Sequence, residues 1–243
     1  MWTLAEYQAT SLFSLKQSTA TSSGGKTLLL PTPYAIKMAL LDVLCRAEGV
    51  AEGRQNWPAL CQAQIALRPV PRLVVNNTFT RTLRPNEGKK QEKEEKEEKE
   101  EKKEKSAYTR SIGYREYVQW QGLLGIAIRS VDLPFERLSQ WLLGLQMLGK
   151  RGSFVQLQAP PQQVEQLPPD YILIDGSLPE AIPLQSLLQR LDDCSPSLTF
   201  EKANIYSNEK VELGKERRLH SVLLPYRRGR ATRGYTEYVR SES

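Results

Sequence analysis

The sequence is poor in the residues that build metal centres and nucleophilic catalytic sites. Its 243 residues include one histidine, His220, and three cysteines without C-x-x-C spacing. No zinc site and no pair of histidines for acid–base work can be assembled from this set. The segment Gly24-Gly25-Lys26-Thr27 resembles the end of a P-loop, but the first glycine of that motif is missing. We therefore expect neither a metal nor a cofactor.

Long apolar runs are missing as well. No stretch approaches the length of a membrane span, and the start, Met-Trp-Thr-Leu-Ala-Glu, lacks the basic and apolar regions of a signal peptide. An odd number of cysteines in apolar or loop contexts indicates free thiols in a reducing compartment. These observations predict a cytoplasmic protein without a membrane partner.

Charge is distributed unevenly along the chain. Residues 87–105 contain nine Glu, eight Lys and no apolar side chain, so this Glu/Lys tract, whether helical or disordered, cannot join a core. Without the tract, 34 − 8 = 26 basic and 28 − 9 = 19 acidic residues remain, so the rest of the chain carries +7, against +6 for the whole chain. Arginine is concentrated near the end of the sequence, interleaved with Tyr226 and followed by Tyr235: Arg217, Arg218, Arg227, Arg228, Arg230 and Arg233. Guanidinium groups pair with phosphates and tyrosines stack on bases, so this segment favours an RNA partner, with a disordered basic tail as the alternative.

The clearest predicted element is a helix that begins at Pro33 and ends before Gly49. Thr32 fits the N-cap, proline fits the first helical position, and glycine fits the left-handed position after the end. Apolar residues cover most of its surface, which predicts packing under a sheet. Tyr34 and Lys37 lie in its first turns, where the helix dipole favours a phosphate. The alternative is a core tyrosine and a solvated lysine.

A second basic cluster is the turn Gly149-Lys150-Arg151-Gly152-Ser153. It follows a predicted helix, and its glycines permit close approach of a ligand to the backbone. Lys150 and Arg151 are candidate phosphate ligands, or alternatively they only cap the helix that precedes them.

The order of predicted elements indicates an α+β fold. Residues 1–158 are expected to form a ferredoxin-like or RRM-like split βαβ domain, in which the two helices back one sheet. Its elements are strands near 2–13, 59–75 (interrupted by Pro69 and Pro71), 117–128 and 153–157, with helices over 33–48 and 134–148. Residues 159–243 are expected to form a smaller β-rich C-terminal lobe with a short helix near 184–191.

Residues 76–114 interrupt this pattern. They are polar and rich in threonine and arginine, with the Glu/Lys tract in the middle, so we predict a protruding hairpin with a solvated tip. The tract itself is expected to act as a spacer. The arms of the hairpin carry further candidate RNA ligands: Arg81, Arg84 and Arg110, with Arg115 at the base.

Four short motifs in this order resemble the Cas five family of CRISPR-associated proteins. They are Pro31-Thr32-Pro33-Tyr34-Ala-Ile-Lys37, Arg115-Glu116-Tyr117, Leu148-Gly149-Lys150-Arg151-Gly152-Ser153, and Leu223-Leu224-Pro225 followed by arginines and Tyr235. The resemblance runs nearly end to end. It implies a ferredoxin-like domain whose inserted thumb is the 76–114 segment, and the Glu/Lys tract departs from the family pattern.

The resemblance also implies a function. The chain would be a non-catalytic Cascade subunit that binds and caps the 5′ handle of the guide RNA. Its partners would be the Cascade backbone subunit, the large Cascade subunit and, through the complex, target DNA, for interference or for guide-directed transposition. The RNA ligands expected are Tyr34, Lys37, Arg81, Arg84, Arg110, Arg115, Lys150, Arg151, Arg227, Arg228, Arg230 and Arg233.

Two other functions are compatible with the residues. A metal-independent endoribonuclease could use His220 with Lys37 or Tyr34, but the adjacent Lys-His pair of the cleaving subtype of the family has no match, because His220 follows a leucine. A general RNA-binding module is the third reading. It would show no preference for a repeat-derived 5′ end.

Overall fold

The computed structural model describes residues 1–18, 24–85, 108–178, 183 and 185–241. Within these residues the chain forms three β-sheets and four helices. All but one of the strand pairs are antiparallel; the exception is β2 (Gly24–Gly25), which pairs in parallel with β5 (Tyr108–Gln121). This confirms the predicted mixture of helices and antiparallel sheets. The Glu/Lys tract lies outside the described residues.

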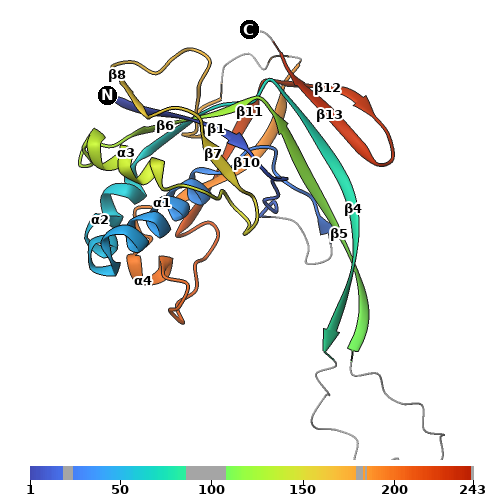
Figure 1. Cartoon of the computed structure of the whole chain (residues 1–243), viewed down its shortest axis with the longest axis horizontal. Helices are drawn as coiled ribbons and strands as arrows, with labels where there is room; N and C mark the ends of the chain where they lie inside the picture. The colour runs from blue at the N-terminus through green and yellow to red at the C-terminus, as the bar shows by residue number, and fades with distance from the viewer. Residues whose placement is uncertain (19–23, 86–107, 179–182, 184, 242–243) are drawn as a thin grey trace, which may run out of the picture.

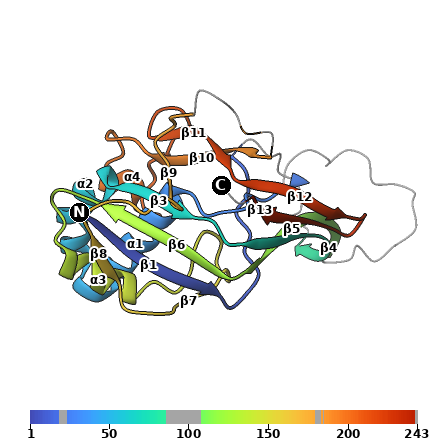
Figure 2. The ribbon, with the colours of Figure 1, turned by 90° about the horizontal axis from the view of Figure 1, so that it is seen from above.

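The first sheet has the strand order β7-β1-β6-β3-β9, with β8 beside the start of β1. Its strands are β1 (Trp2–Ala9), β3 (Gln64–Arg68), β6 (Leu123–Arg129), β7 (Val155–Leu157), β8 (Gln162–Val164) and β9 (Ile172–Leu173). Helices α1 (Pro33–Glu48), α2 (Val50–Gln62) and α3 (Phe135–Leu143) lie on one face of this sheet, below it in Figure 1, and Figure 2 shows the same arrangement from above.

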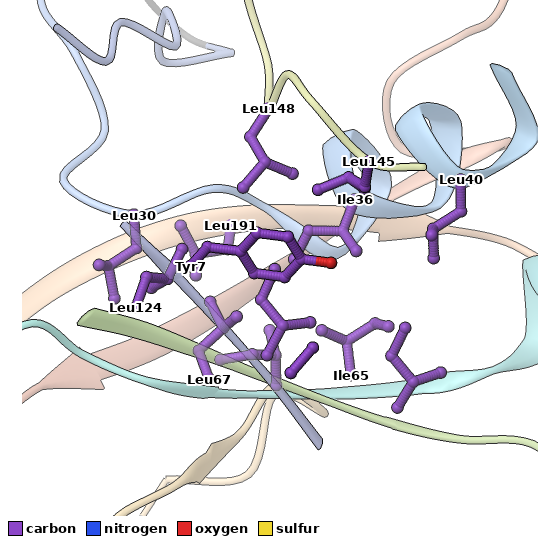
Figure 3. Close-up of a cluster of buried hydrophobic side chains, with 14 of the residues drawn as sticks. Tyr7, Leu30, Ile36, Leu40, Ile65, Leu67, Leu124, Leu145, Leu148 and Leu191 are labelled. Carbon is purple, nitrogen blue, oxygen red and sulfur yellow. The ribbon is translucent and has the colours of Figure 1, made fainter. Parts of the chain in front are cut away.

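The core forms between this face and the helices because side chains alternate along the strands. Tyr7, Ile65 and Leu124 point inward from three neighbouring strands and meet Ile36 and Leu40 of α1. Figure 3 shows this cluster around the ring of Tyr7, whose hydroxyl donates a 2.8 Å hydrogen bond to the carbonyl of Leu142. The bond ties the first strand to the end of α3.

Replacing Tyr7 by phenylalanine should destabilise the protein by about 1 kcal/mol, because a buried neutral hydrogen bond is lost while the ring stays in place. The free energy of unfolding from urea titration measures this. Tyr206→Phe is the matched control, since the Tyr206 side chain is 90% exposed; equal losses in both variants would contradict the prediction.

The opposite face of the first sheet is also covered. Trp2, Ala66, Ala127 and Tyr171 form a second, smaller buried cluster, against which residues from the 160–173 segment pack. Gly125 makes this close packing possible, because a Cβ there would lie 2.5 Å from the Tyr171 hydroxyl. The sheet surface on which an RRM stacks bases is therefore closed in this protein.

The second sheet carries the predicted hairpin. Strands β4 (Arg72–Pro85) and β5 (Tyr108–Gln121) pair over 14 residues each and project far from the rest of the chain (Figure 1). Near its base, β13 (Tyr235–Arg240) pairs with β4, β12 (Tyr226–Ala231) pairs with β13, and β2 pairs with β5. The resulting strand order is β12-β13-β4-β5-β2.

The third sheet contains β10 (Leu187–Cys194) and β11 (Arg217–Leu224), with the short helix α4 (Phe200–Ala203) between them. Leu191, Val222 and Leu224 belong to the same core cluster as the first sheet. The segment 159–243 thus contributes strands to all three sheets. No helix in the described part of the chain is long and apolar enough to cross a membrane.

The helix prediction at Pro33 is confirmed together with both of its boundaries. The Thr32 hydroxyl accepts a hydrogen bond from the Ala35 amide, and Gly49 follows the last helical residue with φ +96°. The Gly49 N–H donates a hydrogen bond to the Cys45 carbonyl at 3.1 Å.

Three other element predictions are corrected. Helix α2 was not expected, and it includes residues 59–62, the start of the strand predicted over 59–75. It contains Pro58 in its interior and buries Trp57, whose indole N–H donates to the Leu198 carbonyl at 2.7 Å. The strand predicted over 117–128 is instead the end of β5 and all of β6, separated by Gly122 with φ +98°. The short helix predicted near 184–191 is wrong, because Leu187 begins strand β10.

The predicted helix over 134–148 is shorter than expected. Pro134 is its N-cap rather than its first helical residue, and the helix ends at Leu143. Leu145 and Leu148, which the pattern placed on the helix, are buried from the segment that follows it. Apolar spacing alone could not distinguish a helical turn from a packed loop.

Candidate nucleic-acid interface

A groove of about 660 Å³ lies between the base of the hairpin sheet and the start of β10. Five of its lining residues have the chemistry that binds a nucleic-acid strand, and we refer to them as the basic groove: Lys26, Tyr114, Arg190, Arg228 and Tyr238. They come from four different strands and from the residue that follows β2. The groove is therefore a product of the fold rather than of one segment.

Strand alternation explains why these side chains share one face. On β5, Trp120 and Val118 are buried in the core, so Glu116 and Tyr114 continue along the same face into the groove. The register pairs Tyr238 with Leu73 of β4 and Arg228 with Tyr238. An arginine and two tyrosines thus lie on the side of the sheet that faces β10.

Hydrogen bonds fix the polar residues between these groups. The Glu116 carboxylate accepts from the Thr27 amide at 3.0 Å and from the Tyr114 hydroxyl at 3.0 Å, and Asn77 Oδ1 lies 2.9 Å from the same hydroxyl. Gln189 Oε1 accepts from the Leu29 amide at 3.1 Å. These contacts position the Tyr114 ring and engage both oxygens of the Glu116 carboxylate.

A glycine permits the close approach that seats Lys26. Gly25 pairs with Arg115, and a Cβ at Gly25 would lie 2.5 Å from the Tyr114 carbonyl oxygen. Only glycine allows the two strands to meet at this distance, so the following Lys26 is held at the rim of the groove.

The electrostatics of the groove favour an anion. Lys26, Arg190 and Arg228 are exposed, and none of them forms an ion pair with another described residue. Burial raises the pKa of Tyr238 and of Tyr114, and for Tyr114 the hydrogen bond to Glu116 raises it further. Both phenols therefore stay neutral and can stack on bases without repelling phosphates.

A second hollow of about 330 Å³ lies at the first turns of α1. Tyr34 forms one wall, with the Arg217 guanidinium 4.4 Å from the centre of its ring. Burial raises the pKa of Tyr34, and the charge of Arg217 opposes this effect. Arg151 also lines the hollow. Tyr34 and Arg151, both predicted RNA ligands, are thus brought together here.

The prediction that Lys37 binds phosphate is wrong. Its side chain is 1% exposed, and its ammonium group donates to Asp193 Oδ1 at 2.6 Å and to the Cys61 carbonyl at 2.8 Å. Cys61 lies in the last turn of α2, whose free carbonyls and negative dipole end attract a cation. Lys37 therefore joins α1, α2 and β10 inside the protein.

The other predicted ligands lie on several surfaces. Arg228 lines the basic groove. Because side chains alternate along β5, Arg115 and Tyr117 lie on the face of that strand opposite to Tyr114 and the groove. Lys150 lies over the ring of Tyr117. The rest divide between the hairpin and the exposed β12–β13 end of the second sheet. Arg81, Arg84 and Arg110 lie on the hairpin, and Arg227, Arg230 and Arg233 lie on β12 and the turn that follows it.

Four groove residues were missed from the sequence: Lys26, Tyr114, Arg190 and Tyr238. The alternation Tyr114, Glu116, Val118, Trp120 was a usable signal, because it places a tyrosine on the buried face of β5 just beyond the core. Arg190 gave no such signal, since its segment was predicted as a helix.

His220, the residue on which the nuclease alternative depends, lies elsewhere. Gly176 is packed against it, with a Cβ position only 2.6 Å from His220 Nδ1. Among the described residues His220 has no hydrogen bond or ion pair with Tyr34 or Lys37. The predicted catalytic partners are instead engaged with Arg217 and Asp193.

Fold and groove together define a mixed α/β protein with a long projecting hairpin and a basic, tyrosine-lined groove at its base. The chain is 22% identical over 233 residues to "CRISPR-associated protein Cas5" of Archaeoglobus fulgidus, covering 94% of this chain and 95% of that protein. This confirms the resemblance to the Cas five family noted from the sequence motifs. No protein-family model matches the chain.

Two solved structures are similar to the chain at low identity. "Crystal structure of a CRISPR protein from Archaeoglobus fulgidus" has a TM-score of 0.45 and 11% identity, covering 99% of this chain and 92% of that one. "CRISPR RNA-guided surveillance complex" contains a chain with a TM-score of 0.44 and 13% identity, at 92% and 88% coverage.

Proposed function

We propose that this chain is a non-catalytic Cascade subunit of the Cas five family that binds and caps the 5′ handle of the CRISPR guide RNA. The basic groove carries the proposal, since it combines three cations that form no ion pair with a described residue and two neutral tyrosines beside a projecting hairpin. Cations along the backbone and aromatic platforms for bases are the two elements of single-strand recognition. Similarity over 94% of the chain to a protein named for CRISPR supports the guide RNA as the strand.

We also propose that the first sheet is a ferredoxin-like split βαβ unit. The strands β1, β3, β6 and β7 are arranged in the order β7-β1-β6-β3, with α1 and α2 after the first of them and α3 after the third. This arrangement supports the assignment. The β4–β5 hairpin, inserted between the second and third of these strands, would then be the thumb.

The hairpin supports a role in assembly. Three of its apolar side chains are exposed: Phe79 (72%), Leu83 (64%) and Ile112 (70%). They lie on one face of the hairpin, because Phe79 and Leu83 are four residues apart on β4 and Ile112 pairs with Arg81 between them. An exposed apolar stripe of this kind marks an interaction surface. We propose that it contacts the neighbouring Cascade backbone subunit, while the body of the chain helps to dock the large subunit and, through the complex, target DNA.

The proposal is tested with end-labelled repeat RNA and the purified full chain in EDTA. We expect the RNA to remain intact on a denaturing gel and to shift on a native gel, because Tyr34 and Lys37, the partners that cleavage by His220 would use, are engaged with Arg217 and Asp193. His220→Ala should behave like the unaltered chain. A discrete cut that this substitution abolishes would instead establish the endoribonuclease alternative.

Preference for the handle is measured in the same gels. Repeat RNA that ends in the 5′ handle should compete more strongly than an unrelated single strand of equal length. Equal competition would favour a general RNA-binding module.

A further inference from the structure

The hollow at the start of α1 has the composition of a small-molecule site, and we call it the α1 pocket. One wall is apolar and is formed by Ala35, Met38 and Ala39 of the helix, with Met147 and Leu15 beside them. Its rim is basic: Lys16, Arg46, Arg151 and Arg217. The volume of about 330 Å³ lies at the lower end of the range for ligand sites, which suits one small molecule rather than a chain.

The charges of the α1 pocket leave a net positive site. Asp192 is compensated by Arg217, whose Nε donates to it at 2.9 Å, and Asp42 is compensated by Arg46 at 2.9 Å. Lys16 and Arg151 are exposed and form no ion pair with any described residue. The two acids are therefore neutralised locally, and the two remaining cations are free to bind an anionic group.

The Tyr34–Arg217 stack gives the pocket a rigid, flat wall. The guanidinium lies 4.4 Å from the ring centre, and its two hydrogen-bond donors to Asp192 fix its plane. A planar ring can pack against such a wall, and Met38 and Met147, which also line the pocket, offer it apolar contacts. The pocket thus offers a slot for a flat ring next to cations for a phosphate.

We propose that the α1 pocket binds one nucleotide, with its base against the apolar wall of α1 and its phosphate at Lys16 and Arg151. The α1 pocket is distinct from the basic groove, but some of the residues that line the two hollows are close neighbours in the sequence. Lys16 faces the pocket and Gln17 the groove, while β10 contributes Asp192 to the pocket and Arg190 to the groove. A strand in the groove could therefore place one nucleotide in the pocket, and a free nucleotide could occupy it independently.

The first experiment uses the four ribonucleoside 5′-monophosphates and the full chain, with binding measured by isothermal titration calorimetry. Arg151→Glu should weaken binding by about tenfold or more, because a charge-assisted contact becomes repulsive. Ala39→Trp should abolish binding by filling the slot without changing the charge. Lys210→Glu is the control for charge, since Lys210 is exposed and lies outside both hollows.

The second experiment distinguishes the source of the nucleotide. A series of repeat RNAs, each with 2-aminopurine at one position, is bound to the chain and its fluorescence is recorded. A single position whose signal changes with the unaltered chain, but not with Ala39→Trp, identifies a guide nucleotide in the pocket. Binding of the monophosphates without such a position identifies a free nucleotide.

The proposal is overturned if no monophosphate binds at millimolar concentration and no 2-aminopurine position responds to Ala39→Trp. This result would leave RNA binding by the basic groove intact, because Ala39 is not part of the groove. Conversely, nucleotide binding with no affinity for repeat RNA would support the pocket and contradict the proposed function.

Discussion

Replacing Lys37 by methionine should destabilise the fold by about 3 kcal/mol while leaving the RNA affinity of the folded protein unchanged. The substitution removes one partner of a buried ion pair, so Asp193 is left without its counter-charge and the Cys61 carbonyl loses its donor. Breaking a buried pair from one side costs about 3–5 kcal/mol, and the 16% exposure of Asp193 places this case at the lower end.

Urea unfolding gives the loss of stability, and a native gel well below the unfolding transition gives the RNA affinity. Lys210→Met is the matched control, expected to change the free energy of unfolding by less than about 0.5 kcal/mol because the side chain is exposed. Adding Asp193→Asn to Lys37→Met should recover part of the loss, because the uncompensated charge is removed. A stable variant with weakened RNA binding would show that Lys37 faces the ligand.

The ends of α1 could be predicted from the sequence, whereas the burial of Lys37 within the same helix could not. Thr32, Pro33 and Gly49 determine the ends of α1 through local backbone chemistry, and both ends were predictable. Whether Lys37 points to solvent or inward depends on Asp193, which is 156 residues away in sequence. No local pattern contains that partner, so the burial of the lysine could not be inferred.

The same limit explains the missed helix and the merged strands. Pro58 normally ends a helix, but α2 keeps it because Trp57, Leu60 and Cys61 are buried by residues distant in sequence. Gly122 separates β5 from β6, yet a glycine within a predicted strand is ambiguous until its positive φ is known. Contacts between residues distant in sequence therefore determine both the helix α2 and the boundary between β5 and β6.

The candidate site was predictable in kind but not in place. Composition indicated arginines and tyrosines near the end of the chain, and of the residues it named Arg228 does line the basic groove. Lys26 and Arg190 join it only because β2 pairs with β5 and β10 faces the second sheet across the groove. A surface assembled from four strands requires the sheet order, which the sequence did not provide.

Reversing two charges in the basic groove should have the largest effect on RNA binding. Arg190→Glu combined with Arg228→Glu is expected to weaken the affinity for repeat RNA by at least about a hundredfold at low salt, since each arginine contributes a charge-assisted contact of roughly 1.5–3 kcal/mol. About six phosphate contacts predict a slope near −4 for the logarithm of the binding constant against that of salt, and losing two should reduce it to about −3.

The salt dependence distinguishes this site from general electrostatic attraction. Lys210→Glu with Lys215→Glu makes the same change in net charge at two exposed residues outside the groove, so it should alter affinity by less than about threefold and leave the slope unchanged. The residual affinity of the groove variant should depend less on salt, because stacking on Tyr114 and Tyr238 remains and involves no counterion release. Equal losses in the groove variant and the control would mean that RNA binds to net charge alone, and a slope near zero in the unaltered chain would mean that RNA is not its ligand.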